Sequence, residues 1–116
     1  MTLREALSVS RNIPALKAFQ EVQKEVGNKK IVEFVEKLGI ELKDNVAYES
    51  YSIGGMSDGV TTVQMAAAYA AFANGGYYTE PYTVKSIKYR ENDKIEEFEQ
   101  TKTQAMKDST AYLMTN

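Results

Sequence analysis

Ser10 and Asn12 are the two side chains whose types and spacing point most directly to chemistry. They flank Arg11, and Pro14 follows at a position typical of a helix start. In an extended tripeptide the first and third side chains point to the same side. A hydroxyl that can pass a proton and a carboxamide that both donates and accepts would then face one cleft. The alternative interpretation is structural, because Ser and Asn are also the usual helix-capping and turn-forming residues.

The composition narrows the chemistry that is available. The sequence of 116 residues contains no histidine and no cysteine, which removes the commonest general base and any disulfide or zinc–thiolate site. Any reaction must therefore use Ser, Lys, Tyr or carboxylates. The net charge of −2 gives no electrostatic reason to expect a nucleic-acid partner. We expect neither a metal nor a cofactor, and the length suits one domain or a piece of one.

A helix over residues 61–73 is the strongest structural signal. Its second half carries no charge, and its only polar group there is the Tyr69 hydroxyl. A helix that is apolar all round is buried, and this one is too short to cross a bilayer. Thr61 and Gln64 form a capping-box pattern at its start, and Asn74-Gly75-Gly76 is typical of a helix end.

The remaining elements predict an α+β fold, with a mainly helical sub-region around that buried helix and one β-hairpin. A capping-box pattern of Thr2 and Glu5 precedes a helix of about two turns. We expect three further helices: one from Pro14 to Val26, one capped by Asn28 that runs to Leu38, and a last one capped by Asp108. The hairpin is expected at about 82–99, with its turn at Asn92-Asp93.

Several blocks of this chain resemble the transpeptidase domain of penicillin-binding proteins. The stretch Ser10-Arg-Asn-Ile-Pro-Ala15 looks like the family's S-x-N motif region, and Leu3–Leu7 matches the helix that leads into it. The block Val60–Gly76 is similar to the family's most recognisable non-catalytic segment, and Tyr78–Tyr82 and Val84–Ile87 also fit. The sequence of these blocks most resembles that of the bifunctional, class A penicillin-binding proteins of Gram-positive bacteria.

The resemblance implies a β-lactamase/transpeptidase-like fold and a serine acyl-enzyme mechanism. Family members cross-link peptidoglycan stem peptides at a D-Ala-D-Ala bond, and β-lactams acylate the same serine. By this resemblance, Ser10 would relay a proton. Asn12 would hold the lysine of the family's S-x-x-K motif and would hydrogen-bond the substrate amide. The chemistry needs no histidine. The resemblance also implies action at the extracytoplasmic face of the bacterial membrane, through an anchor outside these residues.

Two of the family's three motifs do not occur in this sequence. No serine is followed by lysine three residues later, so S-x-x-K is absent. Lys102-Thr103-Gln104 has Gln where K-T-G needs Gly, and Ser57-Asp58-Gly59 resembles S-D-N only superficially. We therefore expect residues 1–116 to be part of one transpeptidase domain, without an internal boundary, lying between S-x-x-K and K-T-G. Such a piece would be inactive alone and prone to self-association.

Two alternatives remain open at this point. The parent protein is either the transpeptidase described above or, within the same superfamily, a serine β-lactamase or a β-lactam sensor. Those functions differ in what deacylates the acyl-enzyme, and the residues responsible would lie outside this chain. The alternative from another class is a complete, non-catalytic α+β module that binds a peptide or a protein. In that case Ser10 and Asn12 are helix caps.

Overall fold

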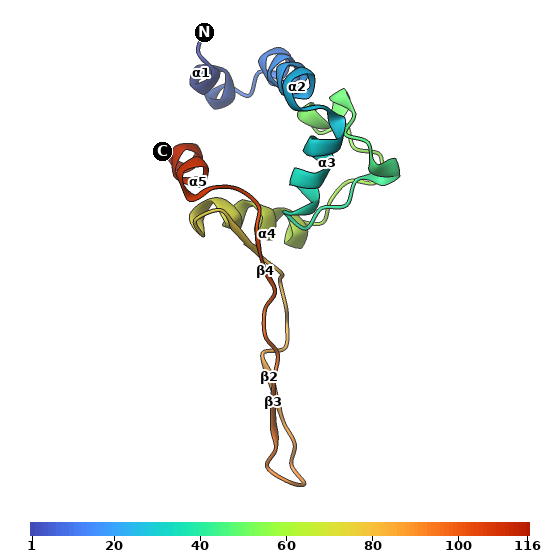
Figure 1. The fold of residues 1–116 in the computed structure, drawn as a ribbon, viewed down its shortest axis with the longest axis vertical. Helices are drawn as coiled ribbons and strands as arrows, with labels where there is room; N and C mark the ends of the chain where they lie inside the picture. Colours follow the sequence, from blue (N-terminus) through green and yellow to red (C-terminus); the bar gives the residue numbers. More distant parts are fainter. The chain divides into compact units, whose positions relative to one another are not determined.

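The computed structural model describes residues 1–116, which form two compact units. The first comprises residues 1–36 and 40–60, and the second comprises residues 37–39 and 61–116. Helices occur in both units, and short antiparallel strands occur in the second (Figure 1). This mixture confirms the predicted α+β class. None of the helices is long and apolar enough to cross a lipid bilayer.

The first unit is built around the helix α2. Its elements are α1 (Leu3–Ser8), α2 (Asn12–Val26), α3 (Asn28–Glu36) and two 3₁₀ helices, η1 (Lys43–Asn45) and η2 (Glu49–Ile53). Helix α2 packs against η2 and also contacts α1 and α3. Val32, Ile40, Leu42 and Ala47 are buried in this unit. The core is small, because most of the other large apolar side chains remain partly exposed.

Local signals explain where α1 and α2 begin and end, with one correction. The predicted capping box is present: Thr2 accepts from the Glu5 backbone, and the Glu5 side chain accepts from the Thr2 backbone. Gly27 ends α2 as predicted. The start of α2 was placed at Pro14, but the helix begins at Asn12. Pro14 still lies in the first turn, where its missing N–H removes no helical hydrogen bond.

Asn28 does not act as the predicted cap. It is the first residue of α3, and its side chain instead holds the backbone of Ala47. The carboxamide nitrogen donates to the Ala47 carbonyl at 2.7 Å, and the carboxamide oxygen accepts from the Ala47 N–H at 3.1 Å. This pair of hydrogen bonds fixes the irregular segment around Ala47 to the start of α3.

The second unit contains the long apolar helix and all the strands. Its elements are α4 (Thr62–Ala73), β1 (Tyr77–Thr79), β2 (Ser86–Lys88), β3 (Ile95–Glu97), β4 (Lys102–Gln104) and α5 (Asp108–Thr115). Helix α4 packs against β1 and α5. Ala68 and Ala71 of α4 are buried, as are Met106 and Ala111. Small side chains on α4 thus allow its neighbours to approach closely.

Both predicted ends of α4 are confirmed, but its burial all round is not. Thr61 and Gln64 form the capping box, and the helix ends at Ala73. However, the side chains of Val63 and Tyr69 are 59% and 66% exposed. The prediction was wrong because residues 1–116 provide packing partners for only part of the helix surface.

The strands form a long two-stranded ribbon that extends away from α4 and α5 (Figure 1). Strands β2 and β3 pair antiparallel, with Ile87 opposite Glu96, which confirms the hairpin predicted at 82–99. Strands β1 and β4 also pair antiparallel, with Tyr78 opposite Thr103, and this pairing was not predicted. The prediction that Asp108 caps the last helix was wrong, since Lys107 holds the N-cap position.

We expect Gly76→Ala to destabilise the second unit strongly. Gly76 has a φ of 87°, and a Cβ there would overlap the carbonyl oxygen of Met106. The left-handed backbone alone costs an L-residue about 1–2 kcal/mol, and the overlap adds to that. Gly54→Ala is the control, because Gly54 has a φ of 86° but a Cβ there would meet no atom within 4 Å. Urea denaturation should show the larger loss for Gly76→Ala, and equal losses would contradict the packing explanation.

We also expect residues 1–116 to self-associate when produced alone. Large apolar side chains are exposed in both units, among them Leu7 and Ile13 in the first and Tyr69 and Leu113 in the second. Large exposed apolar surface favours association. Sedimentation velocity at several concentrations should show a rising mean mass, whereas a rigid monomer throughout would count against this expectation.

Candidate functional site

The two predicted site residues lie at the junction between α1 and α2. Ser10 precedes the N-cap residue of α2, and Asn12 is the first residue of that helix. Both side chains are exposed. Neither makes a hydrogen bond with another group of residues 1–116, so the hydroxyl and the carboxamide are both available to a ligand or to another part of the protein.

A helix-ending turn sets the backbone of this junction. The N–H of Ser10 donates to the Leu7 carbonyl, and the N–H of Arg11 donates to the Ala6 carbonyl, both at 3.0 Å. These two bonds are those of a Schellman motif, which requires a left-handed residue just beyond the helix. Ser10 is that residue, with a φ of 53°. The position is usually occupied by glycine, because a β-carbon there costs about 1–2 kcal/mol.

This geometry corrects the predicted extended tripeptide. Arg11 has an extended backbone, but Ser10 is left-handed and Asn12 is helical. The alternative interpretation, in which Ser10 and Asn12 cap a helix or form a turn, agrees with the structure only in part. Ser10 does form a turn, but the N-cap of α2 is Arg11, and no side chain makes a capping hydrogen bond there. The hydroxyl and carboxamide are therefore not used as caps.

Helix α2 is held in place from its far side by η2. In addition to this packing, the Gln20 side chain donates to the Glu49 carboxylate at 3.1 Å. Asn28, just after the end of α2, holds Ala47 in the segment that leads into η2. Glu49 and Ala47, which hold α2 and Asn28 respectively, thus lie outside the helices and the hairpin predicted from the sequence.

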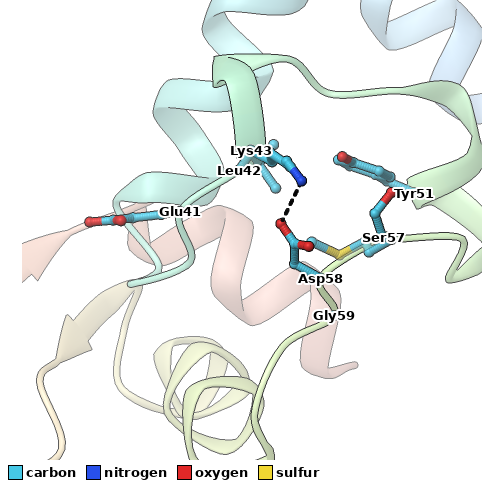
Figure 2. Close-up of a pocket in the computed structure, with 8 residues that line it drawn as sticks. Glu41, Leu42, Lys43, Tyr51, Ser57, Asp58 and Gly59 are labelled. Atoms are coloured by element: carbon cyan, nitrogen blue, oxygen red, sulfur yellow. Dashed lines mark ion pairs between the residues drawn. The ribbon is translucent and has the colours of Figure 1, made fainter.

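The first unit also contains a hollow of about 250 Å³, lined by residues between Glu41 and Gly59. Figure 2 shows Lys43 and Asp58 facing each other across it, with their charged atoms 3.6 Å apart. Both side chains are well exposed, so this ion pair contributes little to stability. The triplet Ser57-Asp58-Gly59 forms part of its wall. Neither Ser10 nor Asn12 lines this hollow.

Lys102-Thr103-Gln104, the near match to K-T-G, forms the strand β4. Gln104 lies opposite Tyr77 of β1 in the ribbon. Little in the sequence signals this strand, since the three residues are mostly polar and their partner strand lies far away in the chain. The triplet belongs to the second unit, whereas Ser10 and Asn12 belong to the first.

Comparison with known proteins gives consistent matches. A family model described as the penicillin-binding protein transpeptidase domain matches residues 1–116. Penicillin-binding protein 1A/1B of Bacillus subtilis is 48% identical over 119 residues, covering 100% of this chain and 12% of that relative. Penicillin-binding protein 1A of Streptococcus oralis is 37% identical over 120 residues, covering 100% of this chain and 18% of that relative. The chain thus spans less than a fifth of the length of these relatives.

We predict that Ser10→Gly stabilises the first unit and that Ser10→Ala does not. Glycine removes the left-handed penalty but adds freedom to the unfolded chain, which leaves a net gain of up to about 1 kcal/mol. Alanine keeps the β-carbon and loses no hydrogen bond, so its effect should lie within about 0.5 kcal/mol. Urea denaturation of both variants measures the difference. A Ser10→Gly variant that is less stable than Ser10→Ala would contradict the assignment of Ser10 to a costly backbone conformation.

Proposed function

We propose that this chain, which belongs to the penicillin-binding protein transpeptidase domain family, is the S-x-N segment of a serine D,D-transpeptidase. The parent enzyme would cross-link peptidoglycan stem peptides and would be acylated by β-lactams. Residues 1–116 would form part of one transpeptidase domain. The nucleophilic serine with its lysine and the K-T-G strand would come from other parts of the parent protein.

The proposed reaction has two steps. A serine oxygen from outside residues 1–116 attacks the carbonyl carbon of the D-Ala-D-Ala bond, and an ester to the enzyme forms. The bond to the terminal D-alanine breaks, and its amine leaves after receiving a proton. The amine of a second stem peptide then attacks the ester, gives up a proton and releases the serine. Ser10 would relay the proton in both steps, and Asn12 would hold the motif lysine and the substrate amide.

One observation carries the proposal. Ser10 and Asn12 expose an unused hydroxyl and an unused carboxamide within three residues, at a backbone turn fixed by two hydrogen bonds. A proton relay needs a hydroxyl whose proton is not already donated in another hydrogen bond. Recognition of an amide needs a carboxamide with a free donor and a free acceptor. The left-handed φ of Ser10 adds support, since a strained position often persists for a functional reason.

The proposal extends to partners and location. The names of the relatives describe penicillin-binding proteins, which supports β-lactams as ligands of the parent. The substrate would be the D-Ala-D-Ala end of a stem peptide. We place the parent at the extracytoplasmic face of the bacterial membrane, where peptidoglycan is cross-linked, with its anchor outside residues 1–116. No cofactor and no nucleic acid take part in this reaction.

Ser10→Ala and Asn12→Ala in the full-length protein test this function. Loss of a general acid–base group should slow acylation by a fluorescent penicillin about 100-fold for Ser10→Ala. Loss of a hydrogen-bond donor at the reacting amide should slow it by a similar factor of about 100 for Asn12→Ala. The measurement is the second-order rate constant of acylation, followed by gel fluorescence.

The matched control is Ser57→Ala, the serine of the other S-x-N-like triplet, which should acylate at the parent rate. If Ser10→Ala and Asn12→Ala also acylate at that rate, the proposed roles are wrong. The lifetime of the acyl-enzyme separates a β-lactamase from the other two functions within the superfamily. A long-lived adduct fits a transpeptidase or a sensor, whereas rapid hydrolysis would assign the parent to the β-lactamases.

Residues 1–116 alone should not react with penicillin. Nucleophilic catalysis requires an activated nucleophile, and no serine here has a lysine three residues later. Intact-mass spectrometry after incubation with penicillin should give only the unmodified mass. A single covalent adduct would show that this segment carries its own nucleophile.

A further inference from the structure

We propose that helix α1 is a positioning element for Ser10, and that the Glu5 side chain keeps this element folded. The inference rests on the proposed function of Ser10. It adds a residue that would not touch the substrate but would act through the backbone of the turn.

The chain itself provides a comparison for the Ser10 turn. Four helices are followed by a backbone hydrogen bond from a residue just beyond the helix to the carbonyl five residues earlier. The donor–acceptor pairs are Arg11 to Ala6, Ile40 to Val35, Gly55 to Ser50 and Gly76 to Ala71. In three of the four turns the left-handed residue before the donor is a glycine: Gly39, Gly54 and Gly75. Only the turn after α1 has a residue with a side chain, Ser10, at that place.

The backbone therefore sets the direction in which the Ser10 side chain leaves the turn. Its oxygen has no hydrogen-bond partner in residues 1–116 that would orient it. The Cα–Cβ direction is set by the φ of 53°, which the bonds to Ala6 and Leu7 maintain. If the last turn of α1 opens, both carbonyls move and Ser10 relaxes to a right-handed or extended backbone. The hydroxyl would then point elsewhere.

Glu5 connects the two ends of α1. Its carboxylate accepts from the Thr2 backbone N–H at 2.6 Å and from the Thr2 hydroxyl at 3.1 Å. Its backbone carbonyl accepts from the Val9 N–H at 3.2 Å and from the Ser8 hydroxyl at 2.8 Å. A helix of six residues is too short to be stable by itself, so these end contacts matter more than in a long helix.

The protonation behaviour of Glu5 agrees with this role. The hydrogen bonds from the Thr2 backbone and side chain lower the pKa of the Glu5 carboxyl below its usual value. The carboxylate is therefore charged at neutral pH, as an acceptor of both Thr2 donors must be. A negative charge in the first turn also interacts favourably with the helix dipole.

Glu5→Ala in the full-length protein tests the inference. We expect the maximal rate of acylation by fluorescent penicillin to fall about tenfold, because a displaced group costs rate rather than binding. The penicillin concentration that gives half the maximal rate should stay unchanged. Glu5→Gln should restore the rate to within about twofold, since Gln also closes a capping box.

Gln64→Ala is the matched control, because it breaks the same kind of capping box in α4, which carries no proposed site residue. It should leave the acylation rate unchanged, and thermal melting should show all variants folded at the assay temperature. Parent-like acylation of Glu5→Ala, or an equal loss in Gln64→Ala, overturns the positioning role. Ser10→Ala is measured alongside: a slow Ser10→Ala with a fast Glu5→Ala rejects only this inference, whereas a fast Ser10→Ala rejects the proposed function itself.

Discussion

Two backbone hydrogen bonds at the end of α1 shape the turn from which the first unit exposes the side chains of Ser10 and Asn12. The N–H groups of Ser10 and Arg11 return to the carbonyls of Leu7 and Ala6, and this reversal lets α2 begin at Asn12. The chain thereby exposes a hydroxyl and a carboxamide within three residues without using either side chain to build the turn. The backbone fixes the structure, and the polar side chains stay available for chemistry.

Other contacts of the first unit hold α2, the helix that follows this junction, in place. Helix α2 is braced by η2, and Asn28 holds the segment that leads to η2 through the backbone of Ala47. The side-chain hydrogen bonds among these contacts are those of Gln20 with Glu49 and of Asn28 with Ala47. The unfavourable φ of Ser10 itself is maintained by the two backbone bonds to Leu7 and Ala6.

Several features that depend on near neighbours in the sequence were predictable, although the caps predicted at Asn28 and Asp108 were wrong. The capping boxes of Thr2 with Glu5 and of Thr61 with Gln64 were both predicted, as was the turn between β2 and β3. Features that depend on distant partners were not. The pairing of β1 with β4 joins segments on either side of the whole hairpin, and no local pattern indicates it. The exposure of α4 was missed because apolar composition predicts burial without saying which residues provide it.

The candidate site shows the same division at the level of single residues. The spacing of Ser10 and Asn12 pointed to this junction, and the family resemblance assigned them their proposed roles. The left-handed backbone of Ser10 had no signal, because a glycine is what normally indicates such a position. A serine that takes a glycine's place looks in the sequence like an ordinary loop residue.

The ribbon of the second unit has a consequence for the order of folding. Direct pairing of β1 with β4 requires the chain to close a long loop, and the entropy cost of closure rises with loop length. Once the tight turn between β2 and β3 has formed, the same strands are already side by side and the remaining loop is short. We therefore expect β2 to pair with β3 before β1 pairs with β4, so that the ribbon forms from its far tip toward α4. The pairing of β4 with β1, and with it the packing of α5 on α4, is thus favoured by a turn that lies at the other end of the ribbon.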